Sequence, residues 1–237
     1  ACAATVNFAE TADQDLMAPY LPALCAKLLA LLQRGARNVQ EGALTALASV
    51  ADSAQEYFVA FYDSTMPLLR HVLEAAQGRE MRLLRAKALE CVSLVGMAVG
   101  KERFAADAAA AMALMQAVSA AGLEADDPFG GYMLQAAARI CSTLGQDFVP
   151  YLPIVMPKML ADATAQPEAV VRGGSDGDDA SDEEGGGEEE EGMETFEMGG
   201  KRVSLHTSAL EEKANACTML CCVAHELRAG FWPYVDE

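Results

Sequence analysis

The chain has 237 residues, of which 52% are hydrophobic and 6% aromatic, and its formal net charge at pH 7 is −18. The hydrophobic content is sufficient for a core, and abundant Ala, Leu, Met and Glu with few aromatic or β-branched runs predict an all-α fold. The negative charge argues against a nucleic-acid partner, because phosphates require a basic surface, and it suits a basic protein partner.

The sequence predicts neither a membrane span nor a signal peptide. Every stretch of about 18 apolar residues is interrupted by charge, and the N-terminal residues lack a basic segment followed by an apolar one. We therefore expect no membrane partner. The chain has no initiator Met, and an apolar pattern resumes at residues 230–235. We expect it to be an internal segment of a longer protein.

The seven cysteines lie mostly within apolar helical patterns, as Cys91 does, and not in a loop-rich framework. An odd number of cysteines in such positions favours free thiols in a reducing compartment, the cytosol or the nucleus.

One short element recurs along the chain: an aromatic or Met residue, two further residues, a second aromatic, and then Pro and apolar residues. Copies begin at Met17, Phe58, Phe148 and Phe231, and a weaker copy begins at Phe104. The steps between successive copies are 41, 46, 44 and 83 residues. The first three steps match the period of roughly 40–47 residues of HEAT and armadillo repeats. The sequence therefore predicts an α-α superhelix, a HEAT-repeat solenoid with an armadillo-like arrangement.

Each repeat is expected to be a pair of helices, with apolar residues at helical spacing on both. Residues 1–172 are predicted to hold four such pairs. A further, truncated repeat is predicted at residues 208–237. The four pairs are expected at about residues 1–34, 38–77, 79–121 and 127–165.

The 83-residue step is predicted to contain one repeat and an insertion, at residues 173–207. Residues 173–200 include twelve acidic residues and nine glycines but no basic residue. Such a segment cannot bury enough apolar surface to offset the entropy lost on ordering, so we expect a disordered, Gly-rich acidic insertion.

Two stretches identify a family. Residues 83–104, LLRAKALECVSLVGMAVGKERF, and residues 210–217, LEEKANAC, resemble the karyopherin-β receptors of the importin-5 family, and the resemblance extends over nearly the whole chain. It implies the central HEAT repeats of a longer receptor that shuttles between cytoplasm and nucleus. In that family the receptor carries basic nuclear-localisation cargo, releases it on binding RanGTP, and crosses nuclear pores by contacting Phe-Gly nucleoporins.

The family also carries an acidic insertion before the helix that residues 210–213 match, although this chain lacks a tryptophan beside its acidic run. The resemblance implies that the run binds a partner, either basic cargo or the basic surface of Ran. A solvated insert without a partner is the alternative. The candidate residues are Asp176, Asp178, Asp179, Asp182, Glu183, Glu184, Glu188, Glu189, Glu190 and Glu191.

The second helices of HEAT repeats usually line the concave surface, and here they carry few acidic residues: Asp63, Glu74, Asp107 and Asp162. If this segment binds cargo, we expect Asp63 and Glu74 to hold a Lys or Arg side chain. The alternative is that these charges form an ordinary solvated helix face.

No catalytic or metal site is predicted, and no cofactor. Cys217, Cys221 and His225 share one helix face but span about 12 Å at roughly 1.5 Å per residue, too far for one zinc ion, so core cysteines are expected. No nucleophile is paired with a base and no phosphate-binding loop follows a strand, so an enzyme is not expected. A HEAT-repeat scaffold or regulatory subunit without transport activity is the alternative function.

Overall fold

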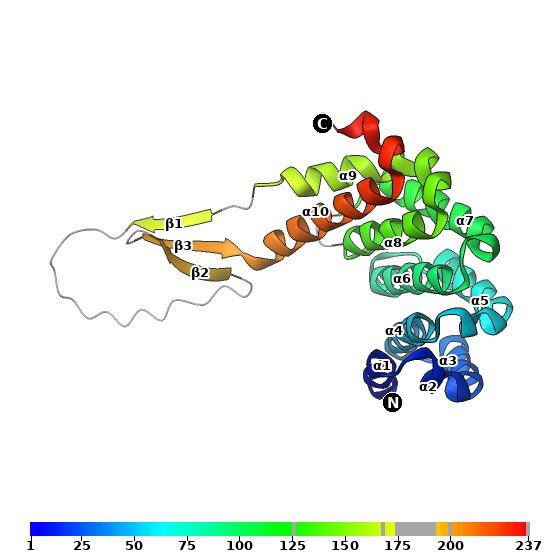
Figure 1. Cartoon of the computed structure of the whole chain (residues 1–237). Coiled ribbons are helices and arrows are strands. Elements are labelled where there is room, and N and C mark those ends of the chain that lie inside the picture. Colours follow the sequence, from blue (N-terminus) through cyan, green and yellow to red (C-terminus); the bar gives the residue numbers. More distant parts are fainter. Residues whose placement is uncertain (125–126, 167–168, 174–192, 199–200, 236–237) are drawn as a thin grey trace, which may run out of the picture.

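The computed structural model describes residues 1–124, 127–166, 169–173, 193–198 and 201–235. Its helices pair and stack side by side from the N-terminus to the C-terminus, and a small sheet extends away from the last pair (Figure 1). The helices alternate along the chain between two layers, which differ in how neighbouring repeats pack against each other.

The first helices of the repeats form one continuous layer. Each of them packs along the first helix of the next repeat. Small buried residues such as Ala46, Ala86 and Ala137 allow the helix axes to approach closely. The layer consists of α1 (Cys2–Thr11), α4 (Arg37–Ala54), α6 (Arg82–Val99), α8 (Phe129–Leu144) and α10 (Thr207–Leu227).

The second helices form the other layer, and each packs mainly on the first helices beside it. Pro22 and Pro153 lie in the first turn of their helices, where the missing backbone N–H costs least. The layer consists of α2 (Gln14–Met17) continuing through the 3-10 helix η1 (Ala18–Tyr20) into α3 (Leu21–Arg34), α5 (Tyr62–Ala75), α7 (Lys101–Ala121) and α9 (Leu152–Thr164).

The recurring aromatic element forms a 3-10 turn between the two helices of a pair. It lies in η2 (Gln55–Phe61), η4 (Gly145–Tyr151) and η5 (Arg228–Tyr234). The first aromatic ring, Phe58 or Phe148, is fully buried and anchors the turn on the core. A short further 3-10 helix, η3 (Arg79–Met81), precedes α6.

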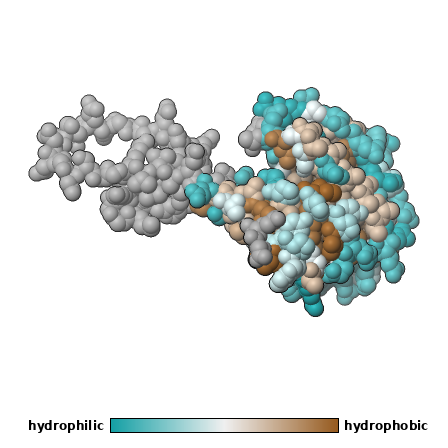
Figure 2. Space-filling model, turned by 90° about the horizontal axis from the view of Figure 1, so that it is seen from above, coloured by the Kyte–Doolittle hydropathy of each residue, from teal (hydrophilic) through white to brown (hydrophobic). Residues whose placement is uncertain are grey.

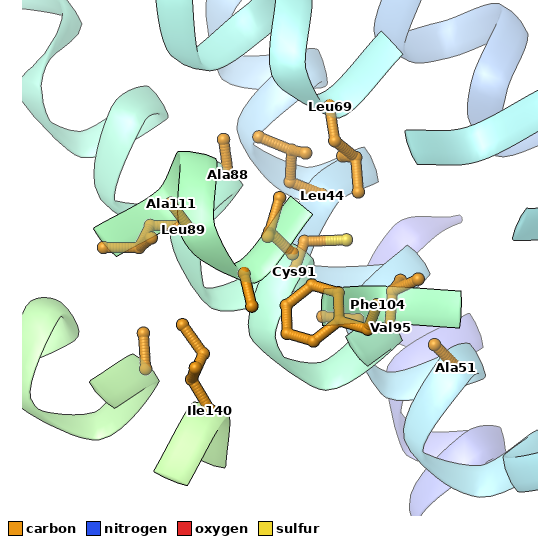
Figure 3. Close-up of a cluster of buried hydrophobic side chains, with 14 of the residues drawn as sticks. Leu44, Ala51, Leu69, Ala88, Leu89, Cys91, Val95, Phe104, Ala111 and Ile140 are labelled. Carbon is orange, nitrogen blue, oxygen red and sulfur yellow. The ribbon is translucent and has the colours of Figure 1, made fainter. Parts of the chain in front are cut away.

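The weaker copy at Phe104 has a different geometry. Here Gly100, with φ of +78°, separates α6 from α7 directly, and no 3-10 turn intervenes. Phe104 therefore lies within α7, and its ring packs against Gly96 of α6. In the core shown in Figure 3, Phe104 lies with Cys91 and Val95 at the centre of buried side chains from several helices.

Polar contacts between repeats confirm the period read from the sequence. Lys87 donates to Thr45, 42 residues away, and Arg139 donates to Ser93, 46 residues away. The Arg103 contact with Asp63 spans 40 residues. Residues one period apart thus occupy equivalent positions in neighbouring repeats. The predicted HEAT-type superhelix is confirmed for the helical repeats.

A three-stranded antiparallel sheet follows α9 and departs from the sequence prediction. Its order is β1 (Ala169–Gly173), β3 (Lys201–His206) and β2 (Met193–Met198). The expectation of an insertion without regular structure is wrong for its described part. The acidic and Gly-rich composition of the whole insertion concealed short β-branched stretches at its ends, and the register places Val171 and Phe196 opposite Val203.

Two helical stretches, Gln14–Arg34 and Lys101–Ala121, are long and apolar enough to cross a bilayer by length and composition alone. In the structure each packs one face on the neighbouring helices and buries residues such as Leu28 and Met112. Apolar residues of both stretches therefore pack within the helical stack.

The end of the stack that carries η5 exposes apolar surface. Seen from that end, hydrophobic residues lie among paler ones and hydrophilic residues gather at the periphery (Figure 2). Trp232 is the most exposed large hydrophobic residue, with 74% of its surface accessible.

Candidate partner-binding surface

Five charged residues of the neighbouring second helices α5 and α7 form the candidate surface, and four of them pair across the two helices. Three of them are acidic, Asp63, Glu74 and Asp107, and two are basic, Arg70 and Arg103. Their pairing determines which carboxylates are available to a partner.

Asp63, a predicted cargo contact, is already paired. Its Oδ1 lies 2.7 Å from Nη2 of Arg103 on α7, and the two side chains are 84% and 44% exposed. An ion pair this exposed contributes only about 0–1 kcal/mol, because water screens both charges. A cationic group from a partner can therefore replace Arg103 at little cost.

Glu74, the other predicted contact, is exposed near the C-terminal end of α5 and has no side-chain partner within the described part of the chain. It lies at the rim of a cavity of about 60 Å³ between α5 and α7, together with Arg70 and Asp107. Its carboxylate is free to accept a donor from outside.

Asp107 occupies the centre of the surface and was not among the residues predicted to bind cargo. Its side chain is only 13% exposed, and its Oδ1 lies 3.3 Å from Nη1 of Arg70. The hydroxyl of Tyr62 donates a hydrogen bond to Oδ2. Burial, followed by this hydrogen bond, raises the pKa of Tyr62, so the hydroxyl stays protonated and keeps donating. The sequence could have indicated Asp107 as part of this surface, because it follows Asp63 at a separation of about one repeat.

Asp162, the remaining acid of the second helices, is held within its own helix. Lys158 Nζ lies 2.7 Å from its Oδ2. An acidic residue four positions from a lysine is a common helix pair, and it leaves Asp162 less available than Glu74.

A second polar cluster fixes the loop between α7 and α8. Asp127 Oδ1 accepts from the backbone N–H of Phe129, the first residue of α8, at 2.9 Å. Its Oδ2 lies 3.2 Å from Nε of Arg82 and 3.4 Å from Nη2 of Arg85. Arg85 also lies over the ring of Phe129. Because Asp127 pairs with both arginines and with the backbone at the start of α8, we assign the cluster a structural role.

The acidic candidates between Asp176 and Glu191 lie outside the described residues, so their positions stay predictions. The sheet defines where the run begins and ends. Gly173, before it, pairs with Lys201, whereas Met193, after it, pairs with His206, the residue before α10.

The cysteines of α10 differ from expectation. Cys217, Cys221 and Cys222 are exposed, so the prediction of core cysteines is wrong for them. The reason is that α10 has a neighbouring first helix, α8, on one side only in this structure. Among the described residues, no three His, Cys, Asp or Glu side chains are arranged to hold a metal ion.

The chain is similar to known proteins over its whole length, although no family model matches it. It is 37% identical over 237 residues to importin subunit beta-3 of Saccharomyces cerevisiae. This alignment covers 100% of this chain and 21% of that protein. It is 31% identical over 212 residues to "Probable importin-5 homolog" of Dictyostelium discoideum, covering 89% of this chain and 18% of that protein. The chain thus spans about a fifth of the length of these curated relatives.

Solved structures agree with these relatives. The crystal structure of Kap121p bound to Pho4p matches with a TM-score of 0.84 at 36% identity, covering 99% of this chain and 21% of that one. Kap121p bound to Nup53p matches with a TM-score of 0.83 at 36% identity, with the same coverage of both chains. Sequence and fold agree that this chain is a HEAT-repeat segment similar to those of importin subunit beta-3 and Kap121p.

Proposed function

We propose that the chain is part of a nuclear import receptor, one that binds basic nuclear-localisation cargo in the cytoplasm and releases it to RanGTP in the nucleus. The observation that carries this proposal is the similarity of this whole chain to a fifth of importin subunit beta-3, together with the match to Kap121p bound to Pho4p. The net charge of −18 supports a basic partner.

Cargo is proposed to bind on the second helices at Asp63 and Glu74. Glu74 offers an unpaired carboxylate, and Asp63 offers one whose exposed bond to Arg103 a lysine or arginine of the cargo can replace. The two residues lie on one helix, 11 positions apart, about 16 Å at 1.5 Å per residue. We therefore propose two contacts along an extended basic peptide and not a single chelated side chain.

The acidic run is proposed to raise the local concentration of basic partners. Residues 176–191 carry ten carboxylates, the candidates named from the sequence, and no basic residue. Attraction by such a run is long-ranged and weakens as salt shortens the Debye length, which is about 8 Å at physiological ionic strength.

Passage through pores is proposed to use a groove between the first helices. A groove of about 210 Å³ lies between α6, α8 and α10, and its apolar lining includes Met97, Ala138 and Met219. It offers space for a phenylalanine ring of a Phe-Gly nucleoporin. A Met97→Glu change should weaken binding of a Phe-Gly repeat peptide, and Leu83→Glu, on the same helix outside the groove, should leave it unchanged.

A pulldown with GTP-loaded and GDP-loaded Ran tests the receptor proposal, using both this chain and a full-length receptor that contains it. Preference for GTP-loaded Ran, reduced by deletion of residues 175–191, supports an importin. Retention of Ran independent of nucleotide, or none by either protein, would favour the alternative, a HEAT-repeat scaffold or regulatory subunit.

A further inference from the structure

Helices α5 and α7 are neighbours in the second layer but are poorly packed against each other. Both pack along α6, yet their backbones scarcely approach one another. A cavity of about 60 Å³ remains between them, lined by Met66 and Leu73 of α5 and by Ala110 and Leu114 of α7. Apolar contact between the two helices is therefore incomplete.

Polar side chains span this gap instead, and we name them the α5–α7 bridge: Tyr62, Asp63, Arg70, Arg103 and Asp107. Asp107 of α7 accepts from Tyr62 and lies 3.3 Å from Arg70. Arg103 of α7 pairs with Asp63 at 2.7 Å, and its guanidinium lies 5.4 Å from the centre of the Tyr62 ring. Each of these contacts joins one repeat to the next.

The two layers differ in what their separation would expose. Drawing apart α4 and α6 would expose closely packed apolar side chains, at about 25 cal/mol for each Å². Drawing apart α5 and α7 would instead exchange hydrogen bonds and ion pairs for bonds to water, and each such exchange costs only about 0.5–1.5 kcal/mol. A change in curvature is therefore cheaper at the bridge than between α4 and α6.

We propose that the α5–α7 bridge is a hinge of the solenoid, and that a cationic partner group bound at Asp63 opens it by displacing Arg103. The first part stands on the packing alone, whereas the second rests on the proposed function. Arg103 connects the two, because it touches both Asp63 and the ring of Tyr62, and Tyr62 in turn holds Asp107. Loss of the exposed Asp63–Arg103 contact should therefore weaken the buried hydrogen bond between Tyr62 and Asp107.

Electron paramagnetic resonance can measure the distance between α5 and α7 directly. Spin labels are attached through non-canonical amino acids at His71 and Gln116, both exposed, so that the seven native cysteines are kept. The variant Asp107→Asn should lengthen the mean distance by about 2 Å or more and broaden its distribution, as in helix shifts at interfaces. Tyr62→Phe, which removes a single hydroxyl, should give a smaller change of the same sign.

Glu102→Gln is the matched control, because it removes one carboxylate from α7 that has no partner in the described part of the chain. It should leave the distance unchanged. An unchanged distance in both bridge variants would overturn the hinge. So would an equal change in the control, since charge alone would then explain the result. If Asp107→Asn fails to fold, Tyr62→Phe decides.

Addition of a lysine-rich peptide separates the hinge from the function. Lengthening of the label distance by the peptide, lost in Asp63→Ala, supports the coupling. Peptide binding without a change in distance would overturn the coupling and leave the proposed cargo surface standing. Absence of binding, together with lengthening in Asp107→Asn, would leave the hinge standing and count against the cargo surface.

Discussion

The first helices and the second helices of the same repeats meet their neighbours in different ways. Along α4, α6 and α8 the interface is close and mainly apolar, with alanines at buried positions and polar contacts such as that of Lys87 with Thr45. Between α5 and α7 it consists of a cavity and a few polar side chains. The first helices therefore join neighbouring repeats by close packing, and the second helices keep charged groups accessible to a partner.

The largest loss of stability is expected from Phe104→Ala, because this ring of α7 packs on α6 of the apolar layer. The ring is fully buried against α6, and its removal should destabilise the chain by about 3–5 kcal/mol. The midpoint of urea unfolding, followed by circular dichroism, measures this. Tyr20→Ala, at a half-exposed aromatic, is the control and should change the midpoint much less.

A smaller loss is expected from Gly96→Ala. An added Cβ would lie 2.4 Å from the Phe104 ring, so the ring or the helix must move, at a cost of about 1–3 kcal/mol. Gly131→Ala in α8 makes the same change where no atom lies within 4 Å, and it should stabilise slightly, by up to about 1 kcal/mol. Equal effects of the two substitutions on the urea midpoint would show that the close approach of α6 and α7 is misjudged.

A loss of stability of intermediate size is expected from substitution of Asp127, a polar residue outside the bridge. Asp127→Ala removes the acceptor of the Phe129 N–H at the start of α8 and leaves Arg82 and Arg85 without this carboxylate, which should cost about 1–2 kcal/mol. Asp147→Ala, which breaks only the exposed pair with Lys101, should cost less than about 0.5 kcal/mol by the same denaturation experiment.

Alkylation of the three cysteines of α10 should have the smallest effect on stability, because they are exposed. The pattern of alkylation itself tests which cysteines are buried. Burial raises the pKa of Cys25 to about 11 and that of Cys141 to about 12, and it raises the pKa of Cys91 as well. The reactive thiolate forms only as pH approaches a thiol's pKa, so at pH 8 these three stay protonated in the folded chain. Iodoacetamide with mass spectrometry should modify Cys217, Cys221 and Cys222 and spare the buried three until urea is added.

The repeat architecture was predictable because a helix pair cannot bury its own apolar stripe and must repeat with a near-constant length. The aromatic turns anchored by Phe58 and Phe148 supplied the period. The strands were not predictable, because the composition of residues 173–200 averaged short β-branched ends with a long acidic centre.

The partner surface was predictable only in part. The acids of the second helices could be named, but their pairing depends on how neighbouring repeats align. Nothing in the local sequence indicates that Arg103 lies against Asp63, or that Glu74 has no side-chain partner among the described residues. The buried position of Asp107 likewise follows from the approach of α7 to α5 and not from its own neighbours in the chain.

The most direct test of the account is the affinity of the chain for a fluorescent lysine-rich peptide at about 0.15 M salt. At this ionic strength the Debye length is about 8 Å, so the effect of distant charges is suppressed. The double change Asp63→Lys with Glu74→Lys is compared with Glu10→Lys and Asp52→Lys, exposed acids of the first helices. We predict that the first pair raises Kd at least about tenfold, or roughly 1.4 kcal/mol, and the second raises it less than about twofold. Equal losses in both would contradict a partner surface on the second helices.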